Sequence, residues 1–413
     1  MTALVASSSS GARVRLPRFD HAGLTIGVEE RDLGLPGPWT RPTTPIRSRA
    51  ALAAAHVVPL PGADNTPGGR PHVDWDATLA FRHELWSYGL GVADAMDTAQ
   101  RGMGLDWETT RELVRRSAAE ARTVGGRIAC GAGTDQLDLA SVPEGRAGLQ
   151  AVVDAYREQV ETVQAAGAQV IVMASRALAR VASGPEDYQW VYDAVLAEVA
   201  EPAVLHWLGT MFDPALEGYW GTHDVLGATD VFVDLVRSHQ DKVDGVKVSL
   251  LDADHEVALR ARLAALDPSD GGPVRLYTGD DFHYPELVVG DARGHSDALL
   301  GIFAVIYPAA STALQALDSG ETARAYEILA ATQALGRHVF AAPTVYYKTG
   351  VAFVAWLNGH QPGFQLLGGL HAGRSLPHLV ELFRLADTAG LLDDPELAAR
   401  RMGALLEVAG GRP

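Results

Sequence analysis

The sequence is poor in cysteine, in lysine and in basic charge as a whole. Its one cysteine, Cys130, excludes an internal disulfide and fits a reducing compartment, so we expect a cytoplasmic protein. A formal net charge of -17, without a basic stripe interleaved with aromatic residues, argues against nucleic acid as a partner. The first 19 residues have no charged segment followed by an apolar core, so we expect no secretory signal.

Long apolar runs are also scarce. The longest, ALLGIFAVIYPAASTALQAL, is interrupted by Pro308 and predicts a buried strand that leads into a helix, so we expect no membrane span. The 413 residues, 47% of them hydrophobic, are enough for a large core, and the 43 glycines indicate many tight connections. The length suits one large α/β barrel with additions, or two ordinary domains.

Short apolar segments recur along most of the chain and predict eight strands. They are ALAAAHVVPL, LGVADAM, GRIACGAG, AQVIVMA, AVLHWLG, DGVKVSLL, VRLYTGDD and ALLGIFAVI. Amphipathic stretches lie between most of them, and Asp74 and Asp106 are expected to cap two of these helices. The strands are apolar throughout, which is typical of a parallel sheet covered on both faces.

Eight strand and helix units in roughly 250 residues favour an α/β protein with a (β/α)₈ TIM barrel over an open, doubly wound sheet. Residues 1–48 are rich in Pro, Arg, Ser and Gly, and only GLTIGVEE resembles a strand; we predict an extension that lies over the main body. The barrel is predicted over residues 49–320. Residues 321–413 are purely helical in pattern and predict a C-terminal helical subdomain.

A lysine inside the sixth predicted strand is the clearest sign of chemistry. The chain has three lysines, and Lys247 lies in the valine-rich run VDGVKVSLLD, on the face opposite Val246 and Val248. Burying an ammonium group costs several kcal/mol unless it is paired, hydrated or deprotonated. A desolvated amine becomes a nucleophile near neutral pH and can form a Schiff base with a carbonyl compound. The structural alternative is an ion pair with Asp280 or Asp281.

Other polar residues follow the strands, where the loops of such barrels build the site. Asp280 and Asp281 could tune Lys247 or move protons, or else cap a helix. His206 could act as a general acid or base, or be a satisfied histidine within the barrel. Arg176 could clamp a substrate carboxylate or form a surface salt bridge. The glycine-rich GAGTD lacks the spacing of a phosphate-binding loop, and close packing of the turn explains it.

The order of these features resembles the dihydrodipicolinate synthase and N-acetylneuraminate lyase family of class I aldolase barrels. DGVKVS is similar to the sixth strand of that family with its Schiff-base lysine, and YTGDDF to the Gly-Asp-Asp after its seventh. RIACGAGT and GAQVIVM resemble its third and fourth strands, and APTVYYKTGVAFVAWLNG and GRSLPHLVELFRLADTAGLL its terminal helices. The resemblance covers residues from about 50 to about 392 and implies a structural role for Lys348 and a homo-oligomer.

Three stretches depart from the family. The family's proton-relaying tyrosine after the fourth strand is absent from MASRALAR. The carboxylate-binding loop after the second strand has counterparts here only in Thr98 and Gly102. On the fifth strand, His206 and Trp207 replace a Tyr-Asn pair. We therefore expect a divergent Schiff-base lyase or aldolase acting on a small carbonyl compound, such as a keto acid or sugar derivative, without a cofactor or metal. The expected catalytic residues are Lys247, His206, Asp280 and Asp281, and the expected substrate contacts are Thr98, Arg176, Ser249 and Tyr284.

Two other functions fit the same residues. One is a metal-dependent barrel isomerase or hydrolase that uses His206, Asp281, His283 and His295, although none of these has a recognised metal-motif spacing. The other is a catalytically inactive barrel that binds a metabolite, which the absent tyrosine and the weakened carboxylate loop suggest.

Overall fold

In the computed structural model, which describes residues 9–267, 269 and 271–410, eight parallel strands close into a barrel. The (β/α)₈ prediction is confirmed, with each strand inside the segment predicted for it or within one residue of it. In chain order, the barrel strands are β3 (Ala51–Ala54), β4 (Gly91–Asp94), β5 (Ile128–Ala132), β6 (Gln169–Val172), β7 (Ala203–Leu208), β8 (Val243–Ser249), β9 (Arg275–Thr278) and β10 (Asp297–Leu300).

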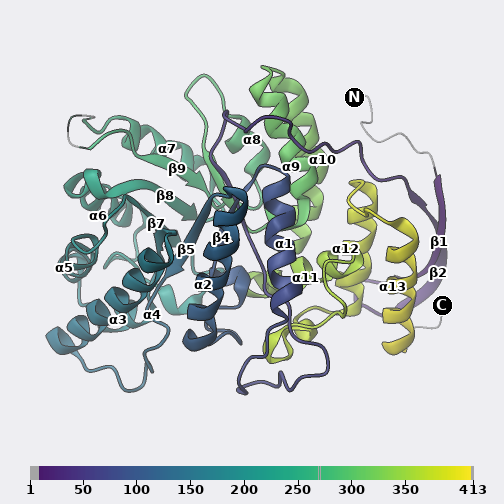
Figure 1. Cartoon of the computed structure of the whole chain (residues 1–413), viewed down its shortest axis with the longest axis horizontal. Helices are drawn as coiled ribbons and strands as arrows, with labels where there is room; N and C mark the ends of the chain where they lie inside the picture. Colours follow the sequence, from purple (N-terminus) through teal and green to yellow (C-terminus); the bar gives the residue numbers. More distant parts are fainter. Residues whose placement is uncertain (1–8, 268, 270, 411–413) are drawn as a thin grey trace.

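Helices follow the strands and cover the outside of the barrel (Figure 1). They are α1 (Trp75–Ser87), α2 (Trp107–Val124), α3 (Gly145–Ala166), α4 (Arg176–Val181), α5 (Pro185–Leu196), α6 (Val225–Ser238), α7 (Ala253–Ala264), α8 (Tyr284–Val289) and α9 (Phe303–Asp318). The two predicted N-caps are confirmed: the Asp74 carboxylate accepts from the backbone N–H of Ala77, and that of Asp106 from Thr109. A predicted strand that reached Ile306 was too long, because α9 already begins at Phe303.

The purely helical C-terminal segment packs on the barrel. It contains α10 (Thr322–Val339), α11 (Tyr347–Leu357), α12 (Leu376–Thr388) and α13 (Pro395–Val408). Helix α10 lies against α8 and α9, and α11 contacts α9, α12 and α13. The division of the chain after residues 48 and 320 stays a prediction. Among the described residues, no helix is both long and apolar enough to cross a membrane.

The N-terminal extension is more regular than expected. Strands β1 (Ser9–Phe19) and β2 (Thr25–Gly34) form an antiparallel hairpin, of which the sequence predicted only the second strand. The inward face of β1 carries Ala12, Val14 and Leu16, all buried, between exposed arginines. The hairpin packs on α12 and α13, at the edge of the molecule away from the barrel (Figure 1). The first eight residues of the predicted extension lie outside the described residues.

Apolar side chains fill the part of the barrel interior toward the amino-terminal ends of the strands. Leu52, Ala93, Ala129, Ile171, Val204, Tyr277 and Leu299 belong to one buried cluster. The Tyr277 hydroxyl donates to Asp244 at 2.7 Å at the amino-terminal end of β8. Because alternate residues of a strand share a face, Val204 is followed inward by His206 and Leu208, and Gly245 by Lys247 and Ser249. The polar inward residues therefore lie toward the carboxyl ends of the strands, where active sites of this fold occur.

Candidate active site

Lys247 points into the barrel near the carboxyl ends of the strands. In the parallel register of the sheet it lies beside His206 on β7 and Tyr277 on β9. Its side chain borders a small cavity of about 10 Å³, room for roughly one water molecule. The barrel contributes Met96, Asp97, Thr98, Leu208, Phe212, Ser249, Asp281 and Gly301 to the walls, and the C-terminal segment adds Phe340 and Tyr347.

The Lys247 amine is held in an environment that disfavours its charge. The residue is 8% exposed, and burial lowers the pKa of its amine, while Asp97 and Asp281 act in the opposite direction. Among the described residues, no carboxylate oxygen lies within 4.0 Å of the Lys247 nitrogen. The ion pair with Asp280 or Asp281 that the sequence left open is therefore not formed.

Asp281 also borders the cavity and is also held toward its neutral form. Its Oδ1 accepts a hydrogen bond from the backbone N–H of Ile302 at 2.7 Å. Burial raises the pKa of its carboxyl to about 8, against the effects of that hydrogen bond and of Lys247. The two shifts together favour an uncharged amine beside an uncharged acid.

Asp280 and Tyr284 are directed away from the cavity. The carboxylate of Asp280 accepts from the backbone N–H groups of Phe282 and His283 and contacts Nδ1 of His283 at 2.8 Å, which stabilises the turn before α8. The Tyr284 hydroxyl lies 2.7 Å from that of Thr332 on α10. Neither residue is among the walls of the cavity.

His206 reaches the cavity through a neighbour. Its Nε2 lies 3.3 Å from the Ser249 hydroxyl, and Ser249 is part of the cavity wall. Its Nδ1 has no hydrogen-bond partner among the described residues. Burial, with a smaller effect from Lys247, lowers the pKa of the imidazole well below its ordinary value, so the ring is neutral at physiological pH.

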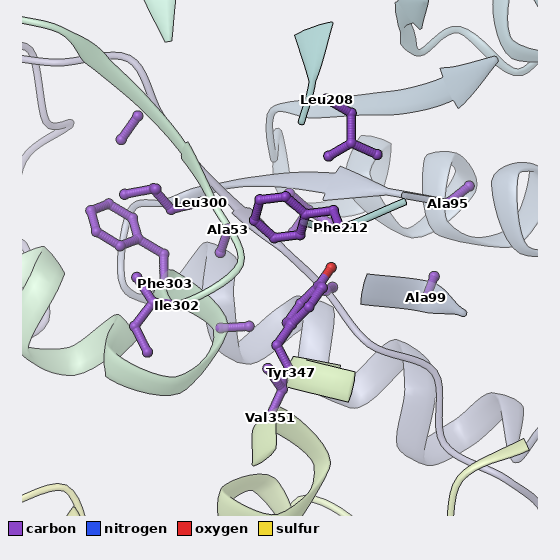
Figure 2. Close-up of a cluster of buried hydrophobic side chains, with 14 of the residues drawn as sticks. Ala53, Ala95, Ala99, Leu208, Phe212, Leu300, Ile302, Phe303, Tyr347 and Val351 are labelled. Carbon is purple, nitrogen blue, oxygen red and sulfur yellow. The ribbon is translucent and has the colours of Figure 1, made fainter. Parts of the chain in front are cut away.

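Tyr347, which the sequence analysis did not select, places a phenol in the same cavity. It is the first residue of α11, and its hydroxyl lies 2.8 Å from that of Thr98. Figure 2 shows the ring rising from α11 toward Phe212, with the hydroxyl oxygen at its far end. The positions of the strand ends do not point to this residue, because it comes from the helical segment after the barrel.

A larger pocket opens beside this cavity at the carboxyl mouth of β4 to β7. It has a volume of about 250 Å³ and shares Asp97 and Leu208 with the cavity. Arg176 lies in it and forms an ion pair with Asp213. Arg101, also in the pocket, is held by Asp135, Gln159 and two backbone carbonyls. Both guanidinium groups are therefore already engaged.

The predicted metal ligands are not gathered into one centre. In the part of the chain that the structure describes, no group of three or more His, Cys, Asp or Glu side chains has an arrangement that could hold a metal ion. His206 lies inside the barrel beside Lys247, whereas His283 is bonded to Asp280 at the start of α8.

This geometry defines a (β/α)₈ barrel protein with a buried lysine near the carboxyl ends of its strands. Within that class, the chain belongs to the family described as "Protein of unknown function (DUF993)", whose family model matches residues 15–411. No curated protein matches the sequence.

Among solved structures, dihydrodipicolinate synthases have similar folds. The Aquifex aeolicus enzyme is 14% identical, with a TM-score of 0.60 over 83% of this chain and 99% of that chain. The chloride-inhibited Acinetobacter baumannii enzyme complexed with pyruvate is 15% identical, with a TM-score of 0.60 over 84% and 100%. The Thermotoga maritima enzyme is 15% identical, with a TM-score of 0.58 over 83% and 100%. At this identity the likeness is one of fold.

Proposed function

We propose that the protein is a Schiff-base-forming lyase or aldolase that acts on a small carbonyl compound through Lys247. The observation that carries the proposal is a buried amine of lowered pKa that faces a small cavity near the carboxyl ends of the barrel strands. Its lone pair attacks the carbonyl carbon, and loss of water leaves an iminium. The iminium then accepts the electron pair of a breaking bond at the adjacent carbon.

Neighbouring residues have proposed roles that follow from their positions. Asp281 adjusts the charge of Lys247: as a carboxylate it favours the ammonium form, and as the neutral acid that burial favours it does not. Ser249, with His206 behind it, carries protons to and from the cavity. Thr98 contacts the substrate, and Arg176, paired with Asp213 but partly exposed in the mouth pocket, attracts an anionic group there. Asp280 and Tyr284 contribute indirectly, by fixing the segment that follows Asp281.

The solved barrels suggest which carbonyl compounds to test first. One dihydrodipicolinate synthase of similar fold was crystallised with pyruvate, so 2-oxo acids are the first choice and small aldehydes the second. The cavity of about 10 Å³ is too small for either, so Leu208 or Phe212 must move to join it to the mouth pocket. From the family resemblance we also propose a homo-oligomer, which light scattering of the purified protein would test.

The decisive experiment traps the iminium. The protein is incubated with each compound and borohydride, and peptides are analysed by mass spectrometry. We expect a mass increase on the peptide that contains Lys247, and none at this site in Lys247→Ala. Lys242→Arg is the matched control, because Lys242 lies outside the barrel and donates to the backbone carbonyl of Val199. If Lys247→Ala still turned over a carbonyl compound that the wild type turns over, the Schiff-base mechanism would be wrong.

A further inference from the structure

Iminium formation requires a proton donor inside the cavity. When the Lys247 amine attacks, the carbonyl oxygen takes the electron pair of the C=O bond and must gain one proton to become a hydroxyl and a second to leave as water. A cavity with room for about one water molecule offers little solvent for these transfers. A side chain within reach of the substrate oxygen must therefore supply the protons.

Few wall residues carry a proton that they could transfer. The Ser249 hydroxyl is paired with His206, and Asp281, which burial holds toward its acid form, already has the proposed role of setting the charge of Lys247. The remaining hydroxyls are those of Thr98 and Tyr347, which lie 2.8 Å apart. Of these two, a phenol is the much stronger acid, with an ordinary pKa of about 10.

The position of the Tyr347 ring is fixed by close packing. The ring is stacked on Phe340, with centroids 4.4 Å apart, and lies edge-on to Phe212, with centroids 6.0 Å apart. Gly301 leaves the space for both aromatic rings, since a Cβ at that position would lie 2.7 Å from Phe340 and 3.2 Å from Tyr347. The hydroxyl is therefore held at one point of the cavity wall.

Charges around the ring suit a phenol that gives up a proton only while the reaction proceeds. Burial raises the pKa of Tyr347, so the phenol keeps its proton in the resting protein. The nitrogen of Lys348 lies 5.0 Å from the ring centroid and donates to the Met103 sulfur at 3.3 Å. Burial lowers the pKa of Lys348 to about 8, which leaves much of it charged at neutral pH. That charge, with the iminium, would stabilise a transient phenolate.

We propose that Tyr347 is the proton donor to the substrate oxygen and that the Thr98 hydroxyl orients it, a proposal that rests on the function proposed above. As the C–N bond forms, the phenol protonates the oxygen and recovers a proton from the attacking nitrogen. It then protonates the hydroxyl, the C–O bond breaks and water leaves. The products are the iminium of Lys247 and the phenolate of Tyr347. Hydrolysis runs the same steps backwards and restores the phenol.

Formaldehyde with cyanoborohydride tests this without knowledge of the natural substrate, because formaldehyde is the smallest carbonyl compound. The rate of methylation at Lys247 is followed by mass spectrometry, with Lys242 as the internal reference. We expect Tyr347→Phe to slow labelling at Lys247 about 100-fold, the lower end of what a positioned general acid contributes. Thr98→Val should slow it less, and Tyr346→Phe, the neighbouring tyrosine, should leave it unchanged.

The pH profile separates a proton donor from a residue that only supports the fold. Without the phenol, dehydration depends on acid from solution, so labelling of Tyr347→Phe should rise steeply as the pH falls, and the wild-type rate should change less. Two results would overturn the role of Tyr347. One is labelling of Lys247 in Tyr347→Phe at the wild-type rate, and the other is labelling that is slower than in the wild type by the same factor at every pH. Labelling of Lys242 but not Lys247 in the wild-type protein would instead refute the proposed function.

Discussion

Two of the three lysines of the chain are buried around the same carboxylate. Asp97 acts on the amines of both Lys247 and Lys348 and raises the pKa of each, while burial lowers both. The sequence placed Lys247 correctly, because its strand has a clear inward face. It could not relate Lys348 to the site, since α11 starts more than 90 residues later in the chain.

The first prediction concerns Asp97. Replacing it with asparagine removes a charge that favours the ammonium form, so the pKa of Lys247 should fall further below its ordinary value. We expect labelling of Lys247 by formaldehyde and cyanoborohydride to persist to lower pH in Asp97→Asn than in the wild type. A free lysine peptide in the same tube is the reference. An unchanged pH profile would show that Asp97 does not set the charge of the amine.

The second prediction concerns Leu208, which lines both the lysine cavity and the mouth pocket. In Leu208→Ala the two spaces should join, so acetaldehyde should label Lys247 severalfold faster than in the wild type. The lost packing should lower the free energy of unfolding by about 2–5 kcal/mol, measured by urea denaturation. Leu139→Ala, a wall of the mouth pocket alone, is the control and should leave the labelling rate unchanged. Equal acceleration in both variants would contradict a barrier at Leu208.

At the scale of elements, the sequence predicts strands well where their whole length is apolar. The eight barrel strands were found because both faces of a covered parallel sheet are buried. β1 was missed because it is rich in arginine. Its buried residues Ala12, Val14 and Leu16 alternate with exposed ones, which is the pattern of a strand covered on one face. Tyr347 was missed for a different reason, since its helix carries no local sign of where it docks.

The third prediction concerns the contact between α7 and β9. Glu256 on α7 is buried, accepts from the hydroxyls of Thr278 and Ser296, and has its pKa raised to about 8 by burial. Its folded pKa lies above its ordinary value, so the unfolded chain loses this proton first as the pH rises. Stability should therefore fall from about pH 4.5 to pH 8, by at most about 1.4 kcal/mol per pH unit. In Glu256→Gln this decline should be reduced, as thermal unfolding at several pH values will show; an identical decline would contradict the assignment.

At the scale of the whole molecule, the C-terminal helices and the barrel form one working unit. Phe340 and Tyr347 complete a cavity whose other walls come from the barrel, so the lysine is closed off only when both parts are in place. The N-terminal hairpin in turn covers α12 and α13 on their outer side. Each added segment is therefore joined through the C-terminal helices to the wall of the candidate site.

Asp387 on α12 is a buried polar link between these helices and the hairpin. Its Oδ2 accepts from Nε of Arg31 at 2.7 Å, and its Oδ1 from the backbone N–H of Gly34 at 2.9 Å. The carboxylate is almost fully buried, whereas the arginine keeps part of its side chain in solvent. Removing the carboxylate would leave a partly buried backbone donor without its acceptor, but the arginine could still be hydrated.

The fourth prediction follows from that link. Asp387→Ala should lower the free energy of unfolding by about 1–3 kcal/mol and should loosen the hairpin, so that trypsin cleaves within β1, after Arg13 or Arg18, under conditions where the wild type is intact. Glu381→Ala is the control on the same helix, because Glu381 forms a partly exposed pair with Arg384 and its loss should cost about 0–1 kcal/mol. If both variants resist trypsin equally, apolar packing and the contacts of Arg384 with Glu29 and the backbone carbonyl of Pro17 are enough to hold the hairpin on α12. If only Asp387→Ala is cleaved, the buried carboxylate is what fixes the N-terminal segment to the helices that close the site.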